Sequence, residues 1–223
     1  MNRMVMRANI DLLLCVLVMF FLISTAGAGQ SSYTLPTAVD TTARYLFFFH
    51  NYYVEVNGPH GDCRYFDLLN AFAKEDVIVV SEVRTDIVSS KDYAKKAAQQ
   101  IQTLLAAGVP PENITISGHS KGGVIALHVS SLLQQPDIKY IILAGCGIKP
   151  LAQAYPEPST IKGTFLSLYA KSDKIAASCN AVLLSSGQEV SSREIILDSP
   201  EGHRLFFKPD RIWLEPITSM LAQ

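Results

Sequence analysis

Residues 118–123 read Gly-His-Ser-Lys-Gly-Gly, and this short stretch indicates the fold. It follows a β-branched run at 114–117, which predicts a strand, and precedes the apolar residues 124–127, which predict a helix. A Gly-x-Ser-x-Gly pattern between a strand and a helix is typical of the tight turn called a nucleophile elbow. Only glycine should fit beside the serine, because a Cβ there would crowd the neighbouring strand or helix. The turn is expected to lift the Ser120 hydroxyl out of a sheet, at the positive end of a helix.

Short apolar runs alternate with helical patterns on both sides of this turn. Strands are expected at 45–49, 77–80, 114–117, 140–143, 164–168 and 194–197. Helices are expected at 65–74, at 92–106, from the elbow to about 133, and at 209–221. Strands that are apolar throughout and alternate with helices indicate an α/β fold. It would have a mostly parallel sheet of about six strands with helices on both faces.

The overall composition is that of an ordinary globular domain. A length of 223 residues and a hydrophobic content of 48% favour one domain with a sizeable core. The formal net charge is −1 and no basic stripe is present, so no nucleic-acid partner is expected.

The N-terminus has the three parts of a secretory signal peptide. Arg3 and Arg7 form a positive region, residues 12–23 are apolar without interruption, and residues 26–28 read Ala-Gly-Ala, a small-x-small cleavage site. We expect residues 1–28 to be removed and residues 29–223 to form the domain of a secreted or periplasmic protein. An uncleaved membrane anchor is the alternative, although the apolar run is short for a helix that spans a bilayer.

Three cysteines would remain after cleavage, namely Cys63, Cys146 and Cys179. An exported protein meets an oxidising compartment, in which disulfides form. Cys146 and Cys179 each follow a strand-like run, so they would lie at the same edge of the sheet if the two strands are neighbours. We therefore favour a Cys146–Cys179 disulfide, with Cys63 free or buried. Three unpaired small core residues are the alternative.

A serine nucleophile needs a base, and the base needs an acid that orients it. Asp173 follows the fifth expected strand, at the carboxyl edge where open α/β sheets place their sites, although a plain turn aspartate is the alternative. His203 lies in a loop after the last expected strand, from which it could reach the serine, although it could also be an exposed loop histidine. His128 is within the helix after the elbow and His119 directly precedes Ser120. His203 is therefore the best base by elimination and by chain order.

The oxyanion of an acyl substrate needs two backbone N–H donors. One is expected from Lys121, the residue after the serine. The other is expected from Asn51 or Tyr52, in the loop that follows the first strand. Polar residues that merely turn the chain are the alternative for this loop.

Four features form one pattern: the elbow in its strand-turn-helix context, the further glycine at Gly123, the placement of the acid and the histidine, and the first-strand loop. This pattern runs from about residue 45 to 221 and resembles the α/β-hydrolase superfamily. It is similar to a compact member without the usual first two strands or a large cap. The resemblance implies a Ser120–His203–Asp173 triad, hydrolysis through an acyl-enzyme, and no cofactor. Asn51 departs from the glycine of many relatives, so its backbone is expected to be strained or its amide to take part.

The expected function is that of a serine hydrolase that cleaves a carboxylic ester, with a small-molecule acyl substrate as its partner. A cleft without a lid or visible peptide-binding features suits small or extended acyl compounds. An amidase, a peptidase or a thioesterase on the same triad is the alternative among enzymes. A non-catalytic binding protein of the same fold also remains open, because fold does not imply function. A membrane would be involved only through an uncleaved N-terminal segment.

Several polar residues near the expected site have no assigned chemistry. His50, His119 and Glu55 are candidate substrate contacts, although Glu55 lies in what is expected to be a loop and could simply be solvated. The Lys121 side chain is expected either to attract an anionic substrate group or to point to solvent. Arg84 is expected in an ion network or a surface salt bridge. No ligand spacing among the histidines supports a metal site, and none is expected.

Overall fold

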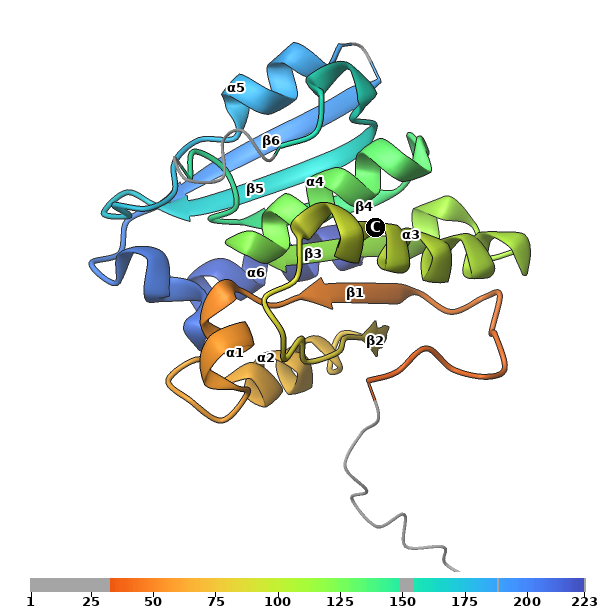
Figure 1. Ribbon diagram of the computed structural model, residues 1–223, viewed down its shortest axis with the longest axis horizontal. Helices are drawn as coiled ribbons and strands as arrows, with labels where there is room; N and C mark the ends of the chain where they lie inside the picture. The colour runs from red at the N-terminus through yellow and green to blue at the C-terminus, as the bar shows by residue number, and fades with distance from the viewer. Residues whose placement is uncertain (1–32, 149–154, 188, 223) are drawn as a thin grey trace, which may run out of the picture. The chain divides into compact units, whose positions relative to one another are not determined.

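Six strands and the helices between them make up the part of the chain that the structure, a computed structural model, describes: residues 33–148, 155–187 and 189–222 (Figure 1). The strands are β1 (Tyr45–Phe49), β2 (Ile78–Val80), β3 (Ile114–His119), β4 (Lys139–Leu143), β5 (Gly163–Ala170) and β6 (Val190–Leu197). The α-helices are α1 (Tyr52–Asn57), α2 (Tyr65–Phe72), α3 (Ser90–Ala106), α4 (Lys121–Leu133), α5 (Asn180–Leu183) and α6 (Arg211–Leu221). The signal peptide expected at residues 1–28 lies outside the described residues.

The strands form one sheet in the order β2-β1-β3-β4-β5-β6, and every neighbouring pair is parallel. The expected parallel α/β sheet is therefore confirmed. The chain moves from β1 to β2 at one edge and then returns to the other side of β1 with β3. This reversal lies between β1 and β3, whose last residues are paired at Phe49 and Gly118. Open α/β sheets bind ligands at the carboxyl ends of the strands at such a point.

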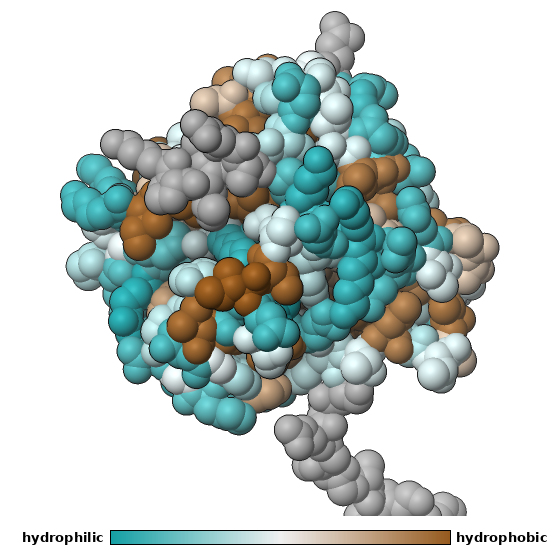
Figure 2. Space-filling model, viewed as in Figure 1, coloured by the Kyte–Doolittle hydropathy of each residue, from teal (hydrophilic) through white to brown (hydrophobic). Residues whose placement is uncertain are grey.

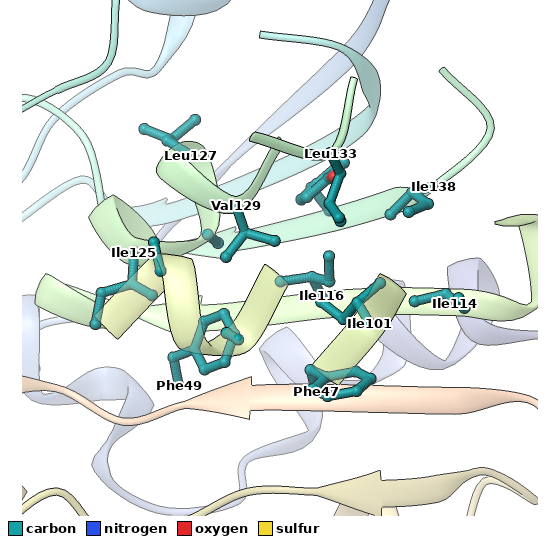
Figure 3. Packing of buried hydrophobic residues seen from close by; sticks show 14 of the residues in the cluster. Phe47, Phe49, Ile101, Ile114, Ile116, Ile125, Leu127, Val129, Leu133 and Ile138 are labelled. Atoms are coloured by element: carbon teal, nitrogen blue, oxygen red, sulfur yellow. The ribbon is translucent and has the colours of Figure 1, made fainter. Parts of the chain in front are cut away.

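Apolar side chains cover both faces of the sheet, because successive residues of a strand point to opposite faces. Phe47 and Phe49 rise from β1 on the side that carries α3 and α4, where they pack in one cluster with Ile101 (Figure 3). Leu46 and Phe48 of the same strand belong to a second cluster, with α2 and α6. In Figure 1, α3 and α4 accordingly lie in front of the sheet and α6 behind it. The expected helices on both faces are confirmed.

Two short helices, α1 and α5, were not expected. The six residues of α1 are too few to show an apolar periodicity. Its start is nonetheless encoded locally, because the Asn51 side chain accepts a hydrogen bond from the Val54 backbone N–H at 3.0 Å. Asparagine is among the preferred residues for this capping position. The prediction that Glu55 lies in a loop is therefore wrong, since Glu55 belongs to α1.

A disulfide joins Cys146 to Cys179, and Cys63 is free and buried. The structure thus contains the pairing that the strand pattern favoured. Beside the disulfide, the Ala177 backbone N–H donates to the Cys146 carbonyl at 2.9 Å. The segment after β5 is therefore fastened to the chain that follows β4.

The surface seen in Figure 2 is mostly hydrophilic, with hydrophobic residues in separate small patches. In the described part of the chain, no helix combines the length and the apolar character needed to cross a bilayer. Four of the large exposed hydrophobic side chains, Tyr52, Val56, Ile87 and Ile175, line the same cavity. Exposed apolar groups gathered in this way are typical of a binding site.

Candidate active site

Ser120 occupies a strained turn between β3 and α4. Its backbone angles, φ 55° and ψ −116°, lie outside the regions that L residues normally adopt. Such strain persists only where the surroundings hold it, and it is concentrated at functional sites. Here the Ser120 N–H donates to the Leu143 carbonyl at 2.8 Å, which ties the turn to the end of β4. The serine side chain is thereby presented at the carboxyl edge of the sheet.

The glycines around Ser120 allow the backbones of β1, β3, α4 and the segment after β4 to meet. A Cβ on Gly118 would overlap the Gly122 carbonyl, and a Cβ on Gly122 would overlap the Phe49 carbonyl. A Cβ on Gly123 would come within 2.8 Å of the Gly145 Cα. The prediction that only glycine fits beside the serine is confirmed, since α4 could not otherwise lie this close to β1 and β3.

Ser120, His203 and Asp173 form a continuous hydrogen-bonded chain. His203 Nε2 lies 2.8 Å from Ser120 Oγ, and His203 Nδ1 lies 2.8 Å from Asp173 Oδ2. The other carboxylate oxygen of Asp173 accepts hydrogen bonds from the backbone N–H groups of Ile175 at 2.7 Å and Ala176 at 2.9 Å. Burial alone would raise the pKa of Asp173, but the hydrogen bonds from His203 and these two amides outweigh it and lower the pKa. An ionised Asp173 keeps the proton on Nδ1 and leaves Nε2 free to accept from the serine.

The segments that carry Asp173 and His203 are also bonded to each other. Asp173 follows β5, and His203 lies in a 3-10 helix, Gly202–Phe207, that follows β6. Between them, the Ser172 hydroxyl donates to the Ser199 carbonyl at 2.5 Å and accepts from the Gly202 N–H at 3.1 Å. Asp173 and His203 are therefore positioned as one unit.

Two helices begin beside Ser120. Lys121 is the first residue of α4 and Tyr52 is the first residue of α1. The first N–H groups of a helix have no partner within it, and they carry the positive end of its dipole. Asn51, Tyr52, Ser120 and Lys121 all line one cavity. The arrangement suits the binding of an oxyanion, and the donors Lys121 and Asn51 or Tyr52 remain a prediction.

The expected special role of the Asn51 backbone or amide is wrong. Its φ of −76° is an ordinary value, so the backbone is not strained. Its side chain is fully engaged, because Oδ1 caps α1 and Nδ2 donates to His119 Nδ1 at 2.9 Å and to Cys63 Sγ at 3.5 Å. Asn51 therefore fastens the start of α1 to the end of β3.

His119 and His50 lie behind the cavity and do not line it, so their prediction as substrate contacts is wrong. His50 Nδ1 donates to the Asn51 carbonyl at 2.8 Å, and its Nε2 accepts from the Arg84 backbone N–H at 2.8 Å. Burial, followed by the charge of Arg84, lowers the pKa of His50 to about 3. Burial, followed by the proximity of His203, lowers the pKa of His119 well below its usual value. Both rings, behind the cavity, are therefore neutral at neutral pH.

Arg84 is the residue near the site whose environment differs most from the prediction. Its guanidinium donates to the His50 carbonyl and lies 4.9 Å from the centroid of the Tyr93 ring. Only 4% of Arg84 is exposed, so the prediction of an ion network or a surface salt bridge is wrong. Nothing in residues 81–89 distinguishes this arginine from a solvated one, because its burial depends on the tertiary contact with His50.

Glu55 and Lys121 form a buried ion pair. Lys121 Nζ lies 2.9 Å from Glu55 Oε1 and 2.7 Å from Oε2. Glu55 therefore neither contacts a substrate nor lies in solvent, and the Lys121 ammonium neither points to solvent nor stands free to bind an anion. Among residues 33–148, 155–187 and 189–222, no group of three or more His, Cys, Asp or Glu side chains could hold a metal ion.

A cavity of about 770 Å³ opens at Ser120. Most of its wall is apolar, from residues of five separate segments: Tyr52, Tyr53, Val56, Ile87, Ile148, Ile175 and Phe207. His203 and Ser120 lie in the same wall. Pockets with apolar walls and few polar groups are typical of sites for small organic ligands. The sequence pointed to few of these side chains, because they meet only in the folded chain.

Comparison with known proteins was consistent with this geometry. The family described as Phospholipase/Carboxylesterase matches residues 50–187, which include Ser120 and Asp173 and end before His203. The carboxylesterase/phospholipase LipF of Mycobacterium tuberculosis is 29% identical over 121 residues, which are 54% of this chain and 32% of LipF. The chain thus matches about a third of the length of this curated relative.

Solved structures show the same fold at low identity. SOBER1 of Arabidopsis thaliana is 14% identical with a TM-score of 0.54, over 81% of this chain and 98% of that one. The RedJ thioesterase from the prodiginine biosynthetic pathway of Streptomyces coelicolor is 14% identical with a TM-score of 0.56, over 85% of this chain and 92% of that one. With its parallel sheet, its serine turn and the family match over residues 50–187, this chain belongs to the phospholipase/carboxylesterase family of the α/β-hydrolase superfamily.

Proposed function

We propose that this protein hydrolyses carboxylic esters, with Ser120 as the nucleophile, His203 as the base and Asp173 as the acid that orients the base. The observation that carries the proposal is the hydrogen-bonded chain of these three residues, with both links at 2.8 Å. Membership of the phospholipase/carboxylesterase family supports ester substrates. The strained, glycine-flanked turn that presents the serine supports a nucleophilic role.

The reaction follows from the positions of the donors and acceptors. Ser120 Oγ attacks the acyl carbonyl while His203 Nε2 takes the serine proton, and Asp173 stabilises the imidazolium through Nδ1. The oxyanion is held by the Lys121 N–H and by that of Asn51 or Tyr52. His203 then gives the proton to the leaving alcohol, and an acyl-enzyme remains. Water, activated by the same histidine, releases the acid and restores the serine.

The cavity favours an ester with an apolar acyl group. Its wall offers apolar side chains, including Tyr53, Ile148 and Phe207, over most of its area. Burying a methylene group there stabilises the complex by about 0.8 kcal/mol. The second-order rate constant should therefore rise with acyl chain length until the cavity is filled.

Labelling with a fluorophosphonate tests the nucleophile. We expect one label per chain, on the peptide that contains Ser120, and no label in Ser120→Ala or His203→Ala. Ser185→Ala is a matched control, because this exposed serine, whose hydroxyl donates to the Ala181 carbonyl at 2.9 Å, does not line the cavity. A folded wild-type protein that takes no label, or a label on another serine, would overturn the proposal.

A panel of p-nitrophenyl esters from acetate to decanoate, beside matched anilides and thioesters, tests the substrate class. We expect hydrolysis of the esters, with kcat/KM rising over the shorter chains, and little hydrolysis of the anilides. Preferential cleavage of the anilides or the thioesters would replace the ester assignment by an amidase or a thioesterase on the same residues.

We also propose that the protein is exported and that residues 1–28 are its signal peptide. The charged, apolar and small-residue parts of this segment support export. The Cys146–Cys179 disulfide supports an oxidising compartment. N-terminal sequencing of protein recovered from the exported fraction should begin near residue 29. A mature chain that still begins at residue 1 would favour the anchor.

A further inference from the structure

The Glu55–Lys121 ion pair has no part in the proton transfers of the proposed reaction. The side chains of Lys121 and Glu55 are only 9% and 0% exposed. Removing two charges from water costs several kcal/mol per ion, and good geometry is needed to offset this cost. An ion pair in this place therefore calls for a reason beyond stability.

The pair connects the two helices that begin beside Ser120. Lys121 is the first residue of α4, and Glu55 lies in α1 one turn after Tyr52. Lys121 Nζ also lies 5.6 Å from the centroid of the Tyr52 ring, within the range of a cation–π contact. The side chains of Lys121 and Glu55 thus connect the start of α4, which carries the expected Lys121 N–H donor, to the first turn of α1, which follows the expected donor at Asn51 or Tyr52.

A third segment meets the same carboxylate. Glu55 Oε1 accepts a hydrogen bond from the Val88 backbone N–H at 2.9 Å. Val88 follows Ile87, which lines the cavity. Both carboxylate oxygens are therefore engaged, and Nζ is paired with both of them, so the ion pair presents no spare charge to a substrate.

We propose that Glu55 and Lys121 are positioning residues that set the distance between the two oxyanion donors, the backbone N–H of Lys121 and that of Asn51 or Tyr52. The inference rests on the proposed function. A helix of six residues is marginal on its own and takes its position from tertiary contacts. Oxyanion donors act at about 2.7–3.1 Å, and a misplacement of about 1 Å can cost about 100-fold in rate. The ion pair holds α1 against α4 within that tolerance.

The test uses the variants Lys121→Met, Glu55→Gln, Lys121→Arg and the double variant with both neutral side chains. Fluorophosphonate titration counts the competent serines, so kcat is expressed per labelled Ser120. Lys121→Met and Glu55→Gln should lower kcat about 10- to 100-fold with KM changed less than about three-fold. Lys121→Arg, which keeps a positive charge beside the Glu55 carboxylate, should recover most of the loss.

An alkylboronic acid such as hexylboronic acid supplies a second readout, because it forms a tetrahedral adduct whose oxygen needs the same donors. Its inhibition constant should rise by about the factor by which kcat falls. The double variant separates positioning from stability: with no unpaired charge left inside, it should unfold at a urea concentration near that of wild type, while its kcat stays low. Lys96→Met is the matched control, since Lys96 forms an exposed ion pair with Glu82 away from the cavity.

The outcomes decide the inference separately from the proposed function. If kcat per labelled serine and boronate affinity match wild type in the variants, the positioning role is refuted while the esterase assignment stands. A loss confined to KM, or a double variant that regains full kcat, also refutes it. If Lys121→Met or Glu55→Gln fails to fold, Lys121→Arg and the double variant still test the positioning role. A wild-type chain that takes no label refutes the proposed function itself.

Discussion

The two halves of the candidate active site are held by different means. In the acid–base half, Asp173 and His203 lie in segments after β5 and β6, which are joined through Ser172 and fastened near the Cys146–Cys179 disulfide. In the oxyanion half, the first turns of α1 and α4 are held by buried polar side chains in and behind the wall of the cavity: His50, Asn51, Glu55, His119 and Lys121. The acid–base half is held by backbone hydrogen bonds to Ser172 and by a nearby covalent link. The oxyanion half is held by a network of neutral rings and one ion pair. Perturbations should therefore affect the two halves in different ways.

The largest expected effect comes from the acid–base half. Asp173→Asn should lower kcat about 10,000-fold, because a neutral amide does not stabilise the imidazolium or hold its tautomer. Steady-state hydrolysis of one p-nitrophenyl ester measures the effect. Asp198→Asn, at an exposed position after β6, should leave kcat unchanged. More than a tenth of wild-type kcat in Asp173→Asn would show that the hydrogen bond to His203 is not used in catalysis.

The disulfide gives the next effect, on stability. Replacing both Cys146 and Cys179 by alanine should lower the free energy of unfolding by about 3–4 kcal/mol, as expected for a cross-link between residues 33 apart. Urea denaturation of the double variant and of reduced wild type measures this. Cys63→Ala tests the other half, because Cys63 Sγ accepts a hydrogen bond from Asn51 Nδ2 at 3.5 Å. It should cost less, since Cys63 is free and no covalent link is lost. Equal urea midpoints for oxidised and reduced wild type would mean that the acid–base half does not depend on its covalent link.

The smallest effect, a dependence of stability on pH, comes from the oxyanion half. The pKa of His50 falls from 6.5 to about 3 on folding, so between these values only the unfolded chain takes up the proton. Stability therefore falls as the pH falls below 6.5, by about 2 kcal/mol from His50 between pH 7 and pH 5. His119 acts in the same direction. The lowered pKa of Asp173 stabilises the folded protein, and this contribution is lost only as the pH falls below 3.8. Asp173 therefore contributes little to the change between pH 7 and pH 5.

Urea denaturation at pH 7 and pH 5 measures this dependence. His50→Gln, in which the amide replaces one donor and one acceptor, should lose about half of the pH-dependent change. His60→Gln, at an exposed histidine, should keep all of it. If His50→Gln and wild type lose the same stability between these pH values, His50 takes up a proton in the folded protein and the wall is not neutral.

The same contrast shows how far sequence could lead. Ser120, Asp173 and His203 were singled out because the roles of such residues follow from chain order and from their places after strands, and the structure brings the three together. The Cys146–Cys179 pair followed from the same reasoning about strand ends. Neither the three site residues nor the disulfide required knowledge of where a side chain points in the folded protein.

The oxyanion half could not be predicted to the same depth. The sequence predicts a loop at Glu55, because the six residues of α1 are too few to show an apolar periodicity. Asn51 was the available signal, since asparagine commonly caps a helix that begins at the next residue and accepts from the N–H three residues further on, here that of Val54. The burial of Arg84, His50 and Glu55 depends on the meeting of distant segments, which no local pattern records.

The close approach of α4 to β1 at Gly122 has a consequence for engineering. Because Gly118, Gly122 and Gly123 have no space for a Cβ and no side chain to shorten, substitution at these glycines cannot widen the cavity. The cavity is also lined by the exposed side chains of Val56, Ile87 and Ile175, which belong to separate segments of the chain. A designer who wants to admit bulkier acyl groups should therefore randomise these three positions and leave the glycines unchanged.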